Sequence, residues 1–330
     1  MADFSPDARL AACGLLVLAS VTSAAEAPTG WTDVETAHFT VKTDLSSEAA
    51  RHAAVLAENS RAALLAAAWP RFKLVNDRLA LVVFSDRRDF QHYFGDVVQA
   101  QAVFGSGGPA IYLFGEPDRW EKSVVRSEAY TSVLMQALAR YLTALFYQSQ
   151  PTWFSTGLAE FLSTVHVSQD GKTASIGHRN YGAYDNYRTY RSATVADALA
   201  WGSTLQPTDE ATLLSLGGLS WLMVAWMYNT HRAEFVRFQA LLGTSLDPKK
   251  AWETVFPTLN LGDLDQELYR FSEPFLLATV VIPEADYSIE QARPMTWDEV
   301  QATRTAAALA GEQAPAAVGG PGSKTETPRN

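Results

Sequence analysis

Residues 133–161, VLMQALARYLTALFYQSQPTWFSTGLAEF, decide the fold of this chain. The segment opens with a long apolar stretch whose core residues recur at helical spacing, at Leu134, Leu138, Tyr141, Leu142 and Leu145. A short polar linker ends at Pro151, and a second apolar stretch follows it. The pattern predicts two consecutive buried helices joined by a short loop.

The residues before this helix pair predict a small sheet with helices. Alternating or continuous apolar runs at 31–44, 79–84 and 110–114 are typical of strands. Residues 48–68, which are rich in Ala and Leu, and residues 86–94 are expected to be helical. We therefore expect an N-terminal α/β region at 26–125.

The residues after the helix pair predict a mainly helical region at 126–285. Asp170-Gly171, between two short apolar runs, predicts a β-hairpin near 164–178 because this dipeptide tolerates positive φ. The Ala, Gly, Pro and Thr residues of 303–330 predict a disordered tail. The predicted fold class is α+β, a small N-terminal sheet with helices packed on a mainly helical domain. Helices of that domain are predicted at 218–230, 233–242, 248–256 and 261–269.

Three segments carry a family resemblance: 31–41 (WTDVETAHFTV), 136–142 (QALARYL) and 153–161 (WFSTGLAEF). In this order they resemble segments of exported bacterial peptidase-MA-like domains, many of which have no assigned substrate. The resemblance implies a gluzincin-like (zincin) fold for the helical region. In active members, two histidines one helical turn apart bind zinc, the Glu between them is the general base, and a Glu of the next helix is the third ligand.

This chain lacks all four of those residues. The resemblance places Gln136 and Arg140 at the histidine positions, Ala137 at the general base and Thr156 at the third ligand. The chain's six histidines, at 38, 52, 92, 166, 178 and 231, include no pair at the spacing of a helical or strand-borne metal site. The chain thus resembles a degenerate member without the HExxH zinc motif, and we expect no metal, no cofactor and no catalytic residue at these vestigial positions.

The polar residues that replace the zinc site have two interpretations. A buried arginine keeps its proton and requires a carboxylate or several carbonyl groups. In the first interpretation, Arg140 forms a structural ion pair with Glu160, assisted by Gln136 and Thr156. In the second, the Arg140 side chain extends to solvent and Glu160 makes local contacts.

Residues 178–191 form a second candidate site, predicted as an aromatic and basic loop. Such a loop would stack on a sugar or bind an anionic group; the alternative is an ordinary surface loop that covers the helical core. The candidate ligand-binding residues of this loop are His178, Arg179, Tyr181, Tyr184, Tyr187 and Arg188.

Composition and apolar patterning limit the classes of partner and the cellular locations that we expect. The formal net charge of −10 argues against a nucleic-acid-binding surface. No uninterrupted apolar run reaches about 18 residues, so no transmembrane span is expected in the mature chain. An apolar run at 10–21 followed by small residues predicts a signal peptide at 1–25 and export to the periplasm; a cytoplasmic location is the alternative.

These observations lead to one expected function and two alternatives. We expect a catalytically inactive, peptidase-like protein that acts in the cell envelope as a scaffold or binds a protein, peptide, glycan or small molecule. The alternatives are an enzyme of another class that uses the former cleft, and a zinc metallopeptidase with an atypical ligand set.

Overall fold

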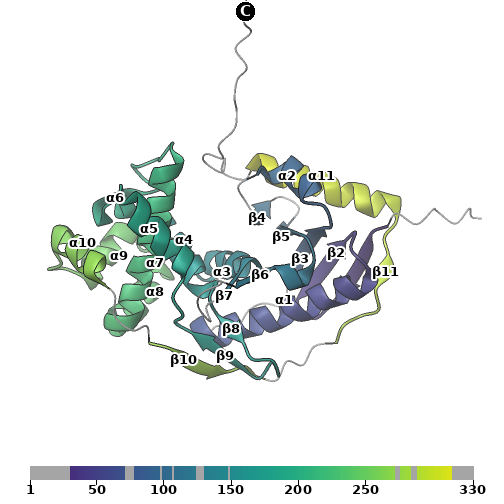
Figure 1. The fold of residues 1–330 in the computed structure, drawn as a ribbon, viewed down its shortest axis with the longest axis horizontal. Helices are drawn as coiled ribbons and strands as arrows, with labels where there is room; N and C mark the ends of the chain where they lie inside the picture. Colours follow the sequence, from purple (N-terminus) through teal and green to yellow (C-terminus); the bar gives the residue numbers. More distant parts are fainter. Residues whose placement is uncertain are drawn as a thin grey trace, which may run out of the picture.

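The structure, a computed structural model, describes residues 30–70, 78–96, 99–105, 108–123, 130–147, 149–271, 276–283 and 288–313. Within these residues the fold is mixed α/β, with a six-stranded sheet followed by a helical region (Figure 1). The predicted class, an N-terminal sheet joined to a mainly helical region, is confirmed. The predicted signal peptide at 1–25 lies outside the described residues.

The sheet contains a parallel centre and antiparallel edges. The strands, in sheet order, are β11 (Arg293–Pro294), β1 (Thr32–Glu35), β2 (Phe39–Thr43), β3 (Leu79–Phe84), β5 (Gly108–Phe114) and β4 (Ala100–Gly105). Strands β2, β3 and β5 are parallel, whereas β4 pairs antiparallel with β5. Because β4 has a described strand on one side only, it forms an edge of the sheet.

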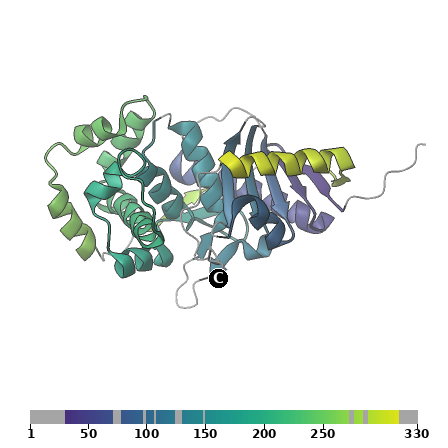
Figure 2. The same ribbon diagram turned by 90° about the horizontal axis from the view of Figure 1, so that it is seen from above.

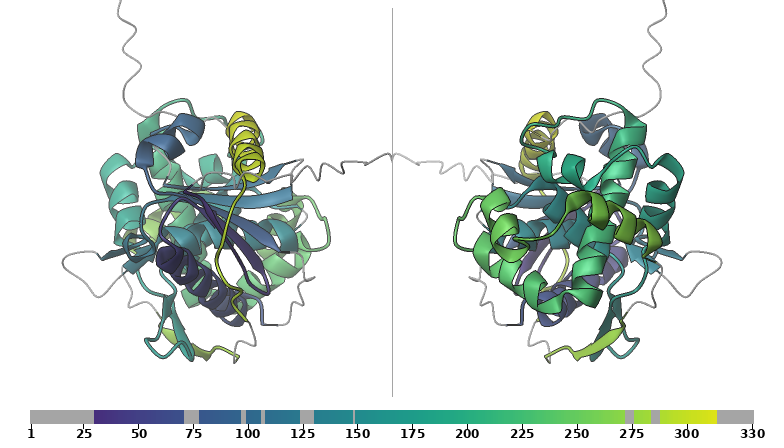
Figure 3. Two further views of the ribbon diagram at one scale, coloured as in Figure 1. Left: turned by 90° about the vertical axis from the view of Figure 1, so that its right-hand side faces the viewer. Right: turned by 90° about the vertical axis from the view of Figure 1, so that its left-hand side faces the viewer.

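Helices cover both faces of this sheet. They are α1 (Ser47–Ala68) on one face, and α2 (Arg87–Phe94) and α11 (Trp297–Gln313) on the other. Side views show the sheet between α1 and the pair formed by α2 and α11 (Figure 3). From above, α11 runs across the strands (Figure 2). The predicted start of α1 holds, because Ser46 caps the helix by accepting a hydrogen bond from the Ala49 backbone N–H at 3.1 Å.

The helical region is built around α7 (Glu210–Thr230), a long and mostly apolar helix. It is joined to the sheet by η1 (Pro117–Arg119), β6 (Glu121–Ser123) and β7 (Tyr130–Ser132). Its helices are α3 (Val133–Phe146), α4 (Thr152–Leu162), α5 (Tyr181–Tyr190), α6 (Val195–Ala200), α7 (Glu210–Thr230), α8 (Arg232–Leu242), α9 (Pro248–Val255) and α10 (Leu261–Arg270). Helix α7 is long and apolar enough to cross a membrane, but most of it is buried by its neighbours, as in the core helix of a domain.

A small three-stranded sheet completes the fold. Strands β8 (His166–Val167) and β9 (Thr173–Ile176) pair antiparallel at the position of the predicted hairpin, and β10 (Ala278–Val281) adds to β9. Gly171 has a φ of +71° in the turn between the first two strands, which is the conformation that the Asp-Gly dipeptide predicts.

Two predictions about irregular structure are wrong. The segment expected as a loop at 178–191 contains the ten-residue helix α5, because Asn180 caps it and its Ala183 and Tyr187 side chains are buried. The tail expected to be disordered from 303 continues α11 to Gln313, because Thr303, Ala307 and Ala310 are buried. Residues 314–330 lie outside the described part of the chain.

Candidate functional site

A cleft of about 910 Å³ lies between the edge strand β4 and the helical region. Helices α3, α4, α5 and α7 all contribute residues to its wall. The predicted positions Gln136, Arg140, Thr156 and Glu160 all line this cleft. The fold therefore brings together the four polar residues that the resemblance predicts at this site.

Helix α3 presents one face to the cleft and the other to the core. Val133, Gln136, Arg140 and Ala144 line the cleft, whereas Leu134, Leu138 and Leu142 are buried on the opposite face. Ala137, which the resemblance places at the position of the general base, is buried in the core and does not line the cleft. Leu145, predicted in the core stripe, is 44% exposed.

Helix α4 is held against α7 by a close backbone approach. A Cβ atom on Gly157 would lie 2.2 Å from the backbone oxygen of Ser220, so only glycine permits this packing. Thr156 and Glu160 lie on the cleft side of the same helix, with Thr156 buried. The packing of α4 on α7 thus fixes the position of the Glu160 side chain relative to α3.

The Glu160 carboxylate accepts hydrogen bonds from two amide side chains. Gln136 Nε2 donates to Glu160 Oε1 at 2.5 Å, and Asn180 Nδ2 donates to Glu160 Oε2 at 2.9 Å. Asn180 also caps α5, because its Oδ1 accepts a hydrogen bond from the Ala183 backbone N–H at 3.0 Å. Asn180 is the member of this cluster that sequence reasoning missed. Its signal was that of a helix cap, in a segment predicted to be a loop.

The structure does not contain the predicted direct ion pair between Arg140 and Glu160. Among the described residues, no carboxylate oxygen lies within the 4.0 Å of an ion pair with Arg140, so Gln136 and Asn180 are the direct partners of Glu160. The two charges still attract each other through space. Arg140 is solvent-accessible, as in the second interpretation, and its accessible surface faces the cleft.

The surrounding protein shifts the pKa values of both Glu160 and Arg140. Desolvation raises the pKa of the Glu160 carboxyl group, and the Arg140 charge and the two amide donors partly oppose this shift. Desolvation also lowers the pKa of the Arg140 guanidinium, and Glu160 opposes that shift. Although water reaches Arg140, protein atoms crowd it within the cleft, which explains the partial loss of hydration. The guanidinium keeps its charge because its ordinary pKa is so high.

The candidate residues of 178–191 lie away from the cleft. None of His178, Arg179, Tyr181, Tyr184, Tyr187 and Arg188 lines it. The cleft side of this segment consists instead of Asn180, Gly182, Ala183 and Asn186.

The arginine side chains of this segment stack on tyrosine rings, both within the segment and on α10. The Arg179 guanidinium lies 5.1 Å from the ring centroid of Tyr184, and that of Arg188 lies 5.1 Å from the ring of Tyr269. The His178 ring is 2.7 Å from the Ser175 hydroxyl.

The donor set of the cleft does not fit a zinc ion. Of the described residues that line it, the ionisable ones are Arg140, Glu160 and Glu210. Across the described ranges, no three His, Cys, Asp or Glu side chains come together as a metal site requires. His38, the histidine of the first resembling segment, is 2.8 Å from Glu58 of α1, outside the cleft.

The polar groups that line the cleft are arranged to bind a ligand through hydrogen bonds. Glu160 is engaged by two donors, and the hydroxyl groups of Ser155, Ser163 and Thr131 line the cleft without a histidine beside them that would act as a base. Arg140 offers donors to a carbonyl or carboxylate group. The β4 wall adds backbone donors and acceptors along an open strand edge.

Comparison with known proteins gives a partial match. No curated protein matches the chain. Residues 141–247, which run from the middle of α3 to just beyond α8, match the family described as "Protein of unknown function (DUF1570)". The matched residues include Glu160 and Asn180, and they begin just after Arg140.

Proposed function

We propose that this chain is a non-catalytic, peptidase-like protein whose cleft binds an extended peptide segment of a partner protein. We place its action in the cell envelope, after export to the periplasm. The observation that carries the proposal is the position of β4, a free sheet edge that forms one wall of the cleft opposite the polar faces of α3 and α4.

Edge strands bind extended peptides by main-chain hydrogen bonding, and side-chain pockets then supply specificity. A described strand pairs with β4 only on its β5 side, so a peptide can add on the other side. The Gln136, Arg140, Glu160 and Asn180 cluster would contact polar groups of that peptide. An open cleft of about 910 Å³ favours ligand binding over a purely structural scaffold.

The test is a selection of phage-displayed random 12-residue peptides on the purified full chain. We expect enriched peptides that bind the wild-type protein and lose binding to Gly217→Trp. Gly217 lines the cleft, and a Cβ atom there meets nothing within 4 Å, so a large side chain at this position has room to leave α7 and project into the cleft. The matched control is Val236→Trp on α8, which is 58% exposed and does not line the cleft, and which should bind as the wild type does.

The same samples decide among the alternatives. The peptides should be recovered intact, and the purified protein should contain no stoichiometric zinc. Stoichiometric zinc with chelator-sensitive cleavage would identify a metallopeptidase with an atypical ligand set. Turnover that resists chelators would indicate an enzyme of another class. Equal binding of the enriched peptides to the wild type and Gly217→Trp would refute the cleft as the binding site.

A further inference from the structure

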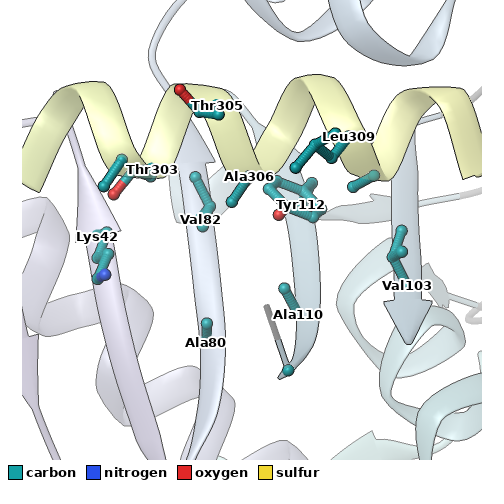
Figure 4. Close-up of a pocket in the computed structure, with 13 residues that line it drawn as sticks. Lys42, Ala80, Val82, Val103, Ala110, Tyr112, Thr303, Thr305, Ala306 and Leu309 are labelled. Carbon is teal, nitrogen blue, oxygen red and sulfur yellow. The ribbon is translucent and has the colours of Figure 1, made fainter. Parts of the chain in front are cut away.

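A second cavity lies on the far side of the sheet from α1, between the strands and α11 (Figure 4). Its volume is about 500 Å³, within the range of small-molecule sites. The strand side chains that line it and the side chains of α11 face each other across it (Figure 4). This groove is independent of the cleft beside β4, because the two share no lining residue.

The strand wall of the groove consists of two rows of side chains. Strand pairing aligns Lys42, Val82 and Tyr112 in one row, and Ala80, Ala110 and Val103 in the next. Residues of alternate positions share one face of a sheet, so both rows point towards α11. Together the two rows extend from β2 to β4, which is three strand spacings or about 14 Å.

Small side chains on both walls leave the groove open. Ala80 and Ala110 line the strand wall further from α11 than Val82 and Tyr112, and Ala306 lines the helix side. Methyl groups are too short to fill the space between a helix and a sheet, so apolar surface stays uncovered there. Leu309 borders the same groove and is 47% exposed, which adds to the apolar surface that a ligand would cover.

The groove has one charged end. Lys42 is its only charged lining residue among those described. In the described part of the chain, its ammonium group has no carboxylate within 4.0 Å. Asp33, the strand partner of Lys42, is already bound by Arg293 at 2.6 Å. The phenol of Tyr112 is a second polar group of the wall.

We propose that this groove binds a single-chain amphiphile, a medium-length fatty carboxylate of about ten carbons. Its apolar chain lies along the two rows of strand residues, under Ala306 and Leu309. Its carboxylate pairs with Lys42, because a cation at one end of an apolar groove is complementary to an anionic headgroup. The occupied groove links α11 to the sheet, so the ligand stabilises the folded chain.

The test compares decanoate with decyltrimethylammonium, which has the same chain and the opposite charge, by calorimetry and thermal unfolding of the full chain. We expect decanoate to bind and raise the Tm, and decyltrimethylammonium to do neither. Lys42→Gln should weaken decanoate binding by about tenfold or more. The matched control is Lys250→Gln, an exposed lysine of α9, which should leave the affinity unchanged.

A second pair of variants tests the apolar wall. Ala306→Phe fills the groove and should abolish binding, whereas Ala308→Phe, on an exposed face of the same helix, should not. Equal binding of both amphiphiles, or full affinity in Lys42→Gln, would overturn the proposal even if Ala306→Phe fails to fold. Gly217→Trp should bind decanoate as the wild type does. The proposal for this groove and the proposal for the peptide cleft are therefore tested independently.

Discussion

At the scale of single residues, the chemistry of the cleft depends on which groups donate hydrogen bonds to the Glu160 carboxylate. The sequence predicted that Gln136 and Arg140 would replace a metal, and the structure places both beside Glu160. It assigns the direct hydrogen bonds to Gln136 and Asn180, which leaves the Arg140 guanidinium open to the cleft. This difference matters for ligand binding, because an Arg140 guanidinium that was hydrogen-bonded to Glu160 would be less available to a ligand.

The pH dependence of stability follows from Glu160. Burial raises its pKa in the folded state above the value in the unfolded chain, so the folded state binds the proton more tightly. The stability that it contributes is full below the unfolded pKa and is lost as pH rises through the folded pKa. Each pH unit between these two values is worth about 1.4 kcal/mol.

Comparison with Glu160→Gln isolates this contribution from that of other carboxyl groups. We predict that the free energy of unfolding of the wild type falls relative to that of Glu160→Gln between pH 4.5 and 7.5, measured by urea unfolding at several pH values. Parallel pH profiles for the two proteins would show that Glu160 titrates as it does in the unfolded chain.

At the scale of elements, most segments with a clear apolar pattern were predicted, whereas strand β4 and helix α5 were missed. The strand at 79–84 and the helix at 48–68 match β3 and α1 to within a residue, because their patterns are unambiguous. Helix α5 contains four tyrosines and no aliphatic stripe, so its sequence resembles a loop. It is helical because α7 buries Ala183 and Tyr187, and packing of this kind overrides weak local preference.

The contact between α5 and α7 depends on one glycine. A Cβ atom on Gly218 would lie 2.4 Å from the Ala183 backbone oxygen and 2.7 Å from the Tyr187 backbone nitrogen. We predict that Gly218→Ala destabilises the protein by about 1–3 kcal/mol, because α5 and α7 must move apart. Gly217→Ala, one residue earlier on the same helix and with nothing within 4 Å, should be neutral or stabilising by about 0.5–1 kcal/mol. Urea unfolding checks both values, and equal effects would contradict the close approach.

At the scale of the whole molecule, segments far apart in sequence pack together to form the cleft and the covered sheet. The cleft takes its walls from β4, α3, α4, α5 and α7, and its lining residues lie between positions 99 and 218. The C-terminal helix α11 packs on the sheet of the N-terminal region, and the Arg293 side chain ties the segment before it to Asp33 of β1. At its other end, Gly311 lies so close to α2 that a Cβ atom would meet the Tyr93 backbone oxygen at 2.2 Å.

This packing predicts a strong effect of truncation. A chain that ends at Ala302 loses the buried side chains of Ala307 and Ala310 and exposes the aromatic cluster around Phe90. We expect a Tm several degrees lower and increased binding of a hydrophobic dye, since burial of that surface is worth a few kcal/mol. A chain that ends at Gln313 serves as the control. It should match the full chain, because residues 314–330 are low in complexity. Equal stability of the two shortened chains would fit the disordered tail that the sequence suggested.

The sequence by itself determined the fold class, the central helix pair and the absence of a histidine pair for zinc, because these depend on apolar periodicity and on residue identity along one element. Only the tertiary structure decided which polar groups meet. Asn180 reaches Glu160, Arg140 faces an open cleft, and α5 and α11 become helices, because each outcome requires a surface supplied by a distant part of the chain. Local pattern carries information over a few turns or strands, whereas hydrogen-bond satisfaction and close packing are settled between elements.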